Sequence, residues 1–484
     1  MFLTTINFSV DHLLNALLRL APTHHVQILD SGGARGSDAR FLIAGFDPLE
    51  VTEAYSDELH IRERPDNSSN ESDWINARPP RIVHGSALAL LDARLARFKV
   101  APVPEFSHLP AFGACVATFS YDLARRFVRL RSHRPASLPT FTFEPDAVFA
   151  FFDTLLIHDY ARGETNVVSI SSDDRIEEIL VTLVGTVDGH ESIVSETRVD
   201  DRLASSNFTR DEYLATVRRI REHIFAGDIY QANLTQQLTC ALPSGVNPED
   251  IFRRLRRDHP ASFAAFLRRR EDTVVSASPE RFLRVEMTED DAAERRIEAW
   301  PIKGTRPRGR DAAEDARLSD ELLNSEKDRA ENVMIVDLLR NDLGRVCRFG
   351  SIEVAELCAL QQHPTLFHLV SKVRGRLRGE VTAGDIMRAA FPCGSITGAP
   401  KLRAMEIIDA VETVPRGLSM GAIGYFSFDG RIDLSVAIRT MTIRDGTARF
   451  NVGGGIVADS DPAQEYEESL LKARALLRAL DAST

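Results

Sequence analysis

Cysteine is scarce in this sequence, and the few cysteines form no pattern. Five occur among 484 residues, namely Cys115, Cys240, Cys347, Cys358 and Cys393. No two have the close spacing of a zinc site or a redox pair, and an odd number cannot all be paired. The sequence therefore predicts reduced, mostly buried thiols without a redox role.

Long apolar runs are also absent. No run approaches the roughly 18 to 20 residues that a membrane-spanning helix requires. The first residues have no basic segment, and Asn7, Asp11, His12 and Asn15 interrupt their apolar run, so they do not resemble a signal peptide. We therefore expect a cytoplasmic protein without a membrane partner.

Excess positive charge is lacking too. The net charge is −12, which disfavours nonspecific binding to nucleic acid. An anionic substrate would then have to be bound by locally placed cations or by a metal ion.

Two polar stretches divide the chain. Residues 56–81 are rich in Asp, Asn, Ser, Arg and Pro, and we interpret them as a long exposed loop. Residues 192–207 lack periodicity and are the predicted main boundary. The chain is thus expected to consist of an N-terminal region, 1–195, and a second region, 208–478.

Local signals in the second region predict both helices and strands. Thr209 and Glu212 form a capping box before an apolar helical pattern. Near the end, residues 421–428, 431–444 and 447–457 look like strands joined at Asp-Gly pairs, which favour hairpins. Asp461 can then cap a final helix. These signals predict a mixed α and β fold with antiparallel sheets.

Two pairs of acidic residues have helical spacing. Asp328 and Glu331 are three residues apart, as are Glu465 and Glu468, so each pair shares one helix face. Carboxylate oxygens in such pairs suit Mg²⁺, which shares its coordination with waters and an anionic substrate. On spacing alone, two solvated helix faces are the commoner explanation.

Three segments have features of anion-binding or reactive sites. Residues 393–401 combine glycines and hydroxyls before a helix, where anions bind well, but the spacing does not fit a P-loop. Residues 453–455 are three glycines in a strand, which indicates either the close approach of a ligand or backbone or a bulge. Lys303 lies between apolar residues and glycine, where its amine could act as a nucleophile. A basic surface loop is the alternative.

Taken together, these segments resemble the family of chorismate-binding enzymes, which includes anthranilate, aminodeoxychorismate, isochorismate and salicylate synthases. The resemblance covers nearly all of residues 208–478, and residues 28–32 and 120–127 match more loosely. Its motifs occur in the family's order at residues 278–282, 301–309, 327–332, 335–346, 368–371, 394–401, 437–440, 453–458 and 465–472. It implies an α+β fold of two face-to-face antiparallel β-sheets with helices packed outside.

The resemblance also implies roles for individual residues. Glu331 and Glu468 match magnesium ligands, and Asp328 and Glu465 match their auxiliary partners. Glu280 matches a general acid, and His368 lines the site. The implied substrate contacts are Thr305, Ser395, Thr397, Tyr425, Arg439, Gly453, Gly454, Gly455 and Lys472. Asp30 and Ser31 match a tryptophan pocket that is regulatory in some relatives and structural in others.

Two positions separate the reactions of the family. Aminodeoxychorismate synthases resemble this chain in carrying lysine at position 303, where anthranilate synthases carry alanine. Isochorismate and salicylate synthases carry lysine where this chain has Gln231, which cannot activate water. The resemblance thus implies amination of chorismate at C4 through a covalent adduct of Lys303 at C2, on the route to 4-aminobenzoate and folate.

The resemblance further implies a partner. The chain has no recognisable glutaminase segment, so ammonia is expected from a separate glutamine amidotransferase subunit. An anthranilate synthase is the alternative among enzymes, and a non-catalytic sensor of chorismate or tryptophan is the alternative of another class.

Overall fold

Two large antiparallel sheets form the protein. The computed structural model describes residues 1–32, 40–65, 74–130, 144–186, 202–288, 294–362 and 366–484. The first sheet has the strand order β1 (Phe2–Ile6), β10 (Glu164–Ser169), β9 (Thr154–Asp159), β3 (Phe41–Gly45), β2 (Gln27–Asp30), β14 (Phe263–Arg268), β15 (Thr273–Ser278), β24 (Thr440–Arg444), β25 (Thr447–Ile456), β13 (Gln231–Ala241) and β12 (Ser205–Ser206), and β21 (Gly398–Ala399) pairs with β13.

The second sheet is of equal size and also antiparallel. Its order is β18 (Ile302–Pro307), β20 (Leu366–Arg376), β17 (Arg295–Ala299), β16 (Arg281–Met287), β23 (Ile432–Val436), β22 (Ala422–Ser427), β7 (Ala114–Phe119), β8 (Ala147–Phe152), β4 (Glu50–Tyr55), β5 (Glu58–Glu63) and β6 (Arg81–His84), and β19 (Glu353–Gln362) pairs with β20. A separate parallel pair joins β11 (Arg202–Leu203) to β26 (Ala482–Ser483).

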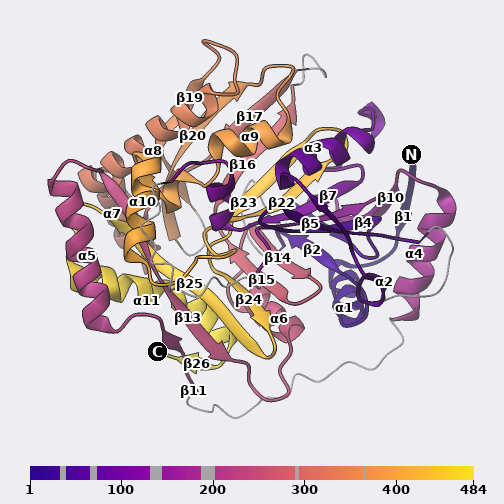
Figure 1. Cartoon of the computed structure of the whole chain (residues 1–484), viewed down its shortest axis with the longest axis horizontal. Coiled ribbons are helices and arrows are strands. Elements are labelled where there is room, and N and C mark those ends of the chain that lie inside the picture. The colour runs from indigo at the N-terminus through magenta and orange to yellow at the C-terminus, as the bar shows by residue number, and fades with distance from the viewer. Residues whose placement is uncertain (33–39, 66–73, 131–143, 187–201, 289–293, 363–365) are drawn as a thin grey trace.

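Helices lie outside the two sheets (Figure 1). They are α1 (Val10–Leu20), α2 (Trp74–Ala77), α3 (Ala87–Arg97), α4 (Asp173–Gly185), α5 (Arg210–Phe225), α6 (Pro248–Asp258), α7 (Ala312–Leu323), α8 (Glu326–Gly344), α9 (Ala383–Ala390), α10 (Lys401–Val411) and α11 (Pro462–Ala479), with short 3₁₀ turns η1 (Pro104–Phe106), η2 (Tyr121–Arg126) and η3 (Gly394–Ile396). The predicted α+β architecture is therefore confirmed.

Successive residues of the strands pack into different cores on the two faces of each sheet. In β7, Val116 packs into the core between the sheets, whereas Cys115 and Ala117 pack into the outer core that includes residues of α3 and α9. Successive side chains of a strand point to opposite faces, so a strand covered on both sides is apolar throughout. All six residues of β7 are buried.

Both halves of the chain contribute to both sheets. In the first sheet, β2 of the N-terminal region pairs with β14. In the second, β7 pairs with β22 near the other end of the chain. The indigo and purple strands of Figure 1 continue in this way into the later strands. The two predicted regions are thus joined by continuous sheets.

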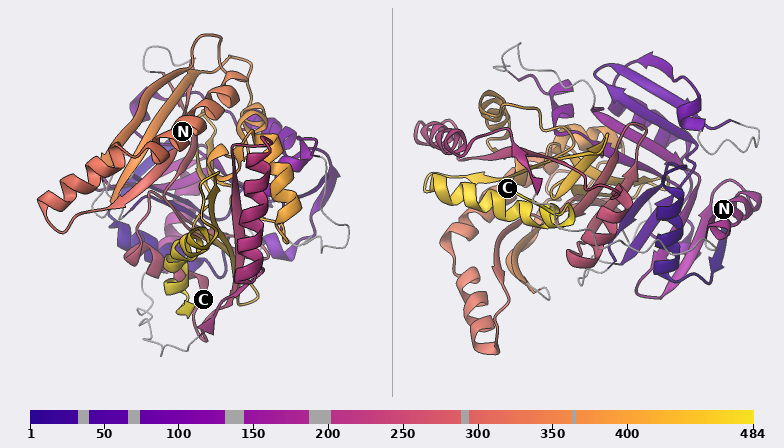
Figure 2. Two further views of the ribbon diagram at one scale, coloured as in Figure 1. Left: turned by 90° about the vertical axis from the view of Figure 1, so that its left-hand side faces the viewer. Right: turned by 90° about the horizontal axis from the view of Figure 1, so that it is seen from below.

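Most local predictions for the second region are confirmed. The capping box of Thr209 and Glu212 begins α5, and Asp461 caps α11. Helices α5, α10 and α11 pack around β13, and Figure 2 shows α5 and α11 on the same side of the molecule. The single strand predicted for 431–444 is wrong. It divides into β23 and β24, which lie in different sheets, because the backbone turns at Arg439 with φ of 47°.

The exposed loop predicted for 56–81 is also wrong in part. Residues 58–63 form β5, in which Leu59 and Ile61 are buried, and Trp74–Ala77 form α2; residues 66–73 lie outside the described residues. Leu59 and Ile61 alternate with polar residues, as a half-buried strand requires. That alternation was masked by the polar composition of the stretch.

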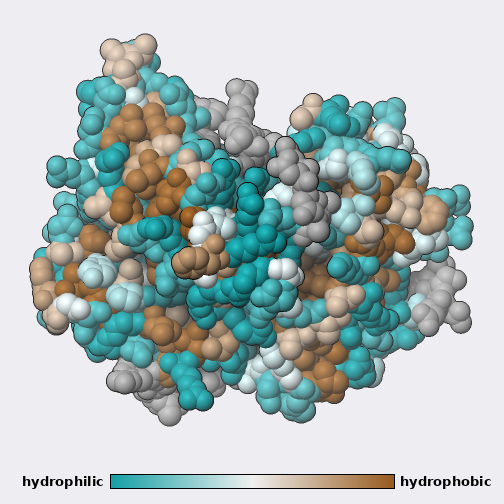
Figure 3. Space-filling model, turned by 90° about the horizontal axis from the view of Figure 1, so that it is seen from above, coloured by the Kyte–Doolittle hydropathy of each residue, from teal (hydrophilic) through white to brown (hydrophobic). Residues whose placement is uncertain are grey.

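The surface mixes polar and apolar residues. Seen from above, polar residues lie between the apolar areas (Figure 3). No helix within the described ranges is long and apolar enough to cross a membrane.

Candidate active site

Glu280 lies at the turn between β15 and β16 and is almost completely buried, with 7% of its surface exposed. The Ser395 hydroxyl donates a hydrogen bond of 2.7 Å to its Oε1. Burial raises the pKa of Glu280, although this hydrogen bond and the ammonium groups of Lys303 and Lys472 oppose the rise. A carboxyl group whose pKa is raised by burial can hold a proton and donate it as a general acid.

The side chain of Lys303, which lies on β18, also contacts Ser395. Its Nζ donates to the main-chain carbonyl of Ser395 at 3.3 Å. Gly304 follows with φ of +79°, and a Cβ there would lie 2.9 Å from Cγ of Asp328. This glycine therefore permits α8 to pack closely against the strand that carries Lys303.

The segment that carries Ser395 is held by its neighbours. Gly398 has φ of +136°, and a Cβ there would lie 2.1 Å from the carbonyl oxygen of Gln231, so only glycine fits beside β13. Thr397 is fully buried and donates its hydroxyl to the carbonyl of Cys393 at 2.8 Å. The structure thus uses the Thr397 hydroxyl inside the segment, whereas Ser395 is directed at Glu280.

Arg416 is a buried residue that the sequence did not point to. It pairs with Glu412 at 2.8 Å and donates to the carbonyls of Ile396 and Asn233 at 2.9 and 2.6 Å. One guanidinium therefore fastens the segment after Ser395 to β13. No local sequence signal could have indicated this link, because the carbonyls of Ile396 and Asn233 are 20 and 183 residues away from Arg416 in the chain.

The two acidic pairs come from different helices. Glu331 on α8 has its pKa raised, first by burial and further by Asp328 and Glu468, while Lys303 and Lys327 oppose the rise. The predicted pairs are thus neighbours in space. Asp328 accepts a hydrogen bond from Arg306 at 3.2 Å.

The acids on α11 have different partners. Glu465 is buried, which raises its pKa, and it accepts a hydrogen bond from Ser460 at 2.6 Å. Glu468 is half exposed and pairs with Lys472 at 2.8 Å. Partial burial acts to raise the pKa of Glu468, but Lys472 and two further lysines outweigh it, so that pKa is lowered.

Lys327, like Arg416, had no predicted role at the site. Its charge acts on Glu331, Glu465 and Glu468. The signal for it was present in the sequence, because Lys327 lies four residues before Glu331 and so shares its face of α8.

The donor set suits a hard divalent cation. Mg²⁺ usually takes one or two protein carboxylates, several waters and substrate oxygens. Glu331 on α8 and Glu468 on α11 are the carboxylates that would take this part. Within the described residues, no group of three or more His, Cys, Asp or Glu side chains is placed to hold a metal ion.

The three glycines lie in β25 without a bulge. Gly453, Gly454 and Gly455 pair in continuous register with Thr235, Leu234 and Asn233. A Cβ at Gly454 would lie 3.2 Å from Oε2 of Glu465 and 3.5 Å from Nζ of Lys472. Close approach, rather than a bulge, therefore explains the glycines. Lys472 also donates to the carbonyl of Gly453 at 3.0 Å.

Three further residues had predicted roles at the site. Thr305 and His368 are register partners in β18 and β20, and the Thr305 hydroxyl lies 2.9 Å from Nδ1 of His368. Arg439 is exposed and ends the turn between β23 and β24, where the chain passes from one sheet to the other. An exposed guanidinium on a fixed backbone turn can bind a carboxylate.

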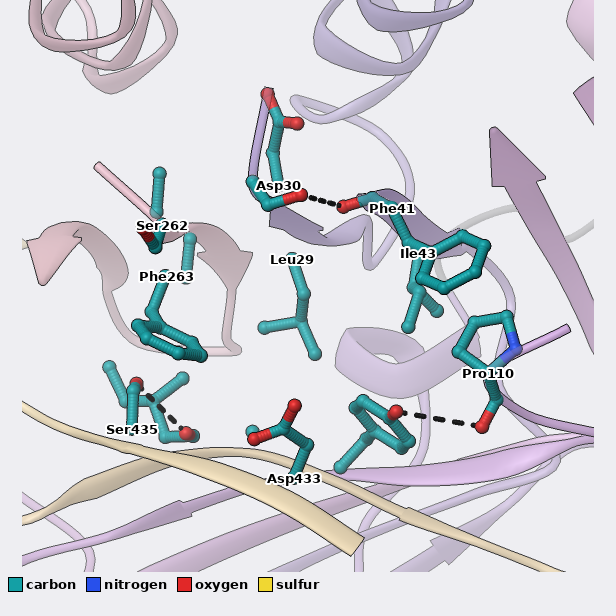
Figure 4. Close-up of a pocket in the computed structure, with 15 residues that line it drawn as sticks. Leu29, Asp30, Phe41, Ile43, Pro110, Ser262, Phe263, Asp433 and Ser435 are labelled. Carbon is teal, nitrogen blue, oxygen red and sulfur yellow. Dashed lines mark hydrogen bonds between the residues drawn. The ribbon is translucent and has the colours of Figure 1, made fainter. Parts of the chain in front are cut away.

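Tyr425 belongs to a different cavity. It lines a pocket between the sheets together with Asp30, Ser31, Phe263 and Asp433 (Figure 4). Neither Glu280 nor Lys303 lines that pocket. The prediction that grouped Tyr425 with the substrate contacts is therefore corrected: the structure groups it with the predicted tryptophan pocket.

The two residues predicted for tryptophan already have partners. Asp30 accepts hydrogen bonds from Tyr160 at 2.6 Å and from Arg256 at 2.7 Å, and its carboxylate is turned away from Asp433 in Figure 4. The Ser31 hydroxyl donates to the carbonyl of Phe41 at 2.7 Å. Tryptophan binding stays a prediction, and contact with Asp30 would have to compete with Arg256.

Known proteins resemble this chain in sequence and in fold. The family model described as chorismate binding enzyme matches residues 28–478. Aminodeoxychorismate synthase component 1 of Klebsiella aerogenes is 39% identical over 454 residues, which cover 94% of this chain and 93% of that protein. Anthranilate synthase component 1 of Acetivibrio thermocellus is 37% identical and covers 92% and 87%. The crystal structure of anthranilate synthase component I from Streptococcus pneumoniae TIGR4 matches with a TM-score of 0.74, 27% identity, and coverage of 91% and 93%.

Proposed function

The chain belongs to the family of chorismate-binding enzymes, and we propose that it aminates chorismate at C4 as an aminodeoxychorismate synthase component 1. The observation that carries the proposal is the position of Lys303. Its amine and the carboxyl group of Glu280 are both hydrogen-bonded to Ser395, so a nucleophile and a general acid lie at one point.

The first half of the proposed reaction forms a covalent adduct. Nζ of Lys303 attacks C2 of chorismate, the ring double bond shifts, and the C4 hydroxyl departs. Glu280 donates the proton that turns this hydroxyl into water, and it recovers a proton from the lysine nitrogen. The raised pKa of Glu280 supports that exchange.

The second half replaces the lysine by nitrogen at C4. Ammonia bonds to C4, the double bond shifts back, and the C2–Nζ bond breaks. The proton lost by the new amine goes to the departing lysine. Chorismate and ammonia thus give 4-amino-4-deoxychorismate and water, and the pyruvyl group is retained.

Magnesium is part of the proposal. Glu331 and Glu468 would hold it, with Asp328 and Glu465 beside them; when bound, it would offset the charge of the substrate's ring carboxylate. Arg439 and the backbone of Gly453–Gly455 would orient the substrate through its carboxylates. Ammonia would come from a separate glutamine amidotransferase subunit, and the product would serve 4-aminobenzoate and folate synthesis.

An anthranilate synthase is the second candidate, because a relative of that name is 37% identical. Direct attack of ammonia at C2 would then replace the adduct, and pyruvate would be released. Lys303 would have no covalent role in that reaction.

The test uses chorismate, magnesium and an ammonium salt at alkaline pH, with products identified by mass and fluorescence. We compare the parent with Lys303→Ala and with Lys372→Ala, a control on β20 that pairs with Glu356. The parent and the control should form aminodeoxychorismate, and Lys303→Ala should lose most of this activity. With ammonium omitted, the intact mass of the parent should show the adduct. Anthranilate and pyruvate from the parent would overturn the proposal.

A further inference from the structure

Bulges in β18 and β19 flank the same stretch of β20. On one side, residues 303–304 of β18 together oppose the single residue Leu369. On the other side, residues 357–358 of β19 together oppose Ser371. A bulge redirects the side chains of its strand, and bulges are frequent beside active sites. The bulge in β18 contains Lys303, the proposed nucleophile.

Each of these bulges contains a residue with a left-handed backbone. Gly304 in β18 has φ of +79°, which glycine adopts without strain. Cys358 in β19 has φ of 51°, where the Cβ atom of any other residue crowds its own backbone. Such strain persists only where the surrounding contacts enforce it, and it is common at functional sites. The contacts of Cys358 therefore have to hold this bulge in place.

Ser371 provides those contacts. Its hydroxyl accepts a hydrogen bond of 2.8 Å from the N–H of Cys358 and donates one to Oδ1 of Asn332 on α8. Its own N–H donates to the carbonyl of Pro301 at 3.2 Å, two residues before Lys303. Ser371 has no exposed surface, so its loss would leave buried polar groups unpaired. One residue thus links β19, α8 and the strand that carries Lys303.

Asn332 completes the link from the side of the helix. It is fully buried, and its Nδ2 donates to the carbonyl of Leu369 at 3.2 Å. Its Oδ1 accepts from Ser371. The amide therefore bonds to β20 at the two residues that lie opposite the bulges. Because Glu331 precedes Asn332 on α8, these bonds also set the depth at which Glu331 lies against the sheet.

The spacing between α8 and β18 matters for the proposed reaction. Lys303 attacks C2, which is bonded to the ring carbon that carries the carboxylate. Glu331 is one of the residues proposed to hold magnesium beside this carboxylate, and the charge of Lys303 acts on Glu331. Groups that serve adjacent ring atoms need a fixed spacing, because small displacements of reacting groups cost large factors in rate.

We propose that Asn332 and Ser371 are positioning residues that hold the amine of Lys303 at a fixed spacing from Glu331, an inference that rests on the proposed function. Neither residue has exposed surface to offer to a substrate, so both act through the segments that they join. An amide and a hydroxyl suit this task, because they form hydrogen bonds without adding charge beside the acids and lysines of the site.

Ser169 is a matched control in the other sheet. It lies in β10 and has no exposed surface. Its hydroxyl accepts from the N–H of Ser171 at 3.2 Å and from the hydroxyl of Thr154 at 3.0 Å. Ser371→Ala and Ser169→Ala thus each remove a buried hydroxyl that bonds to one main-chain amide and one side chain. Both changes should lower Tm by a similar amount, about 2 °C.

The experiment measures adduct formation by intact mass in the full chain, with ammonium omitted and chorismate varied. Ser371→Ala should lower the rate at saturating chorismate about tenfold, whereas Ser169→Ala should keep the parental rate. The half-saturating concentration of chorismate should stay unchanged in both, because the proposed substrate contacts are intact. Asn332→Leu should show the same loss as Ser371→Ala. The double variant should lose no more than either single variant, because the two residues act as one unit.

The outcomes separate this inference from the proposed function. If the parent forms neither the adduct nor the aminated product, the proposed function fails and the inference falls with it. If the parent forms both but Ser371→Ala forms the adduct as fast as Ser169→Ala, the inference alone is wrong. Losses that multiply in the double variant would show two independent structural effects, and an effect confined to the half-saturating concentration would show a role in substrate binding. Either result would also overturn the inference.

Discussion

The hydroxyl of Ser395 lies 2.7 Å from a carboxylate oxygen of Glu280 and donates a hydrogen bond to it. The bond stabilises the charged form of the carboxyl group, so it limits the rise in pKa that burial of Glu280 causes. The carbonyl of the same serine accepts from Lys303. One residue thus sets both the acidity of Glu280 and the position of the amine.

We expect Ser395→Ala to move the alkaline limb of the pH–rate profile to higher pH. Without the hydrogen bond, the pKa of Glu280 rises further, and the acid stays protonated to a higher pH. We also expect kcat to fall about tenfold, because Glu280 loses the hydrogen bond that orients its carboxyl group, whereas the Lys303 amine keeps its main-chain acceptor. Rates measured as a function of pH check both effects.

Ser276→Ala is the control for this change. Ser276 is also buried but is bonded to Thr440, so its loss should leave the profile in place. An alkaline limb in Ser395→Ala that coincides with that of the parent would show that Glu280 is not the group responsible for it.

Magnesium is expected to stabilise the folded protein. A ligand that binds only the native state at 100 times its dissociation constant adds about 2.7 kcal/mol to the free energy of unfolding. Thermal unfolding of the parent should therefore shift upward with Mg²⁺, and Glu331→Gln should lose most of the shift. Glu326→Gln, on the exposed first turn of the same helix, should keep it. The activity should also disappear in chelator, whereas a non-catalytic tryptophan sensor would bind its ligand equally well there.

Arg416 is expected to contribute strongly to stability. It is 3% exposed and paired with Glu412, which is 5% exposed. Removing one partner of a buried pair leaves an uncompensated charge, so Arg416→Met should lower the free energy of unfolding by about 3 to 5 kcal/mol. Urea unfolding checks this value. The double variant Arg416→Met, Glu412→Gln should recover part of the loss, and a single-variant loss below about 1 kcal/mol would contradict the prediction.

Local signals were enough to predict much of the fold. The caps at Thr209 and Asp461 and the Asp-Gly hairpins act within a few residues, and the structure confirms them. The break at Arg439 could not be foreseen from the pattern, because both sides of it alternate as strands do. Only the tertiary fold requires the chain to change sheets there.

The contacts within the site could not be predicted from the hydrophobic periodicity of the sequence. Ser395 and Glu280 are 115 residues apart in the chain, so no local pattern indicates their contact. The family resemblance supplied most of these residues, but it placed Tyr425 with the wrong group. It gave no role to Lys327 or to Arg416, and the carbonyl groups that Arg416 binds become evident only in the structure.

The stability of the protein is expected to fall at mildly acidic pH because of His25. Burial and the charge of Arg268 lower the pKa of this histidine from 6.5 to about 4. Between these values the unfolded chain binds a proton that the folded protein does not, so the free energy of unfolding decreases as pH falls from 6.5 to 4. The shift of about 2.5 units corresponds to about 3 kcal/mol. In His25→Gln, urea unfolding across this range should lose that part of the slope, whereas the exposed His84→Gln should keep it. An unchanged slope in His25→Gln would show that other groups cause the acid sensitivity.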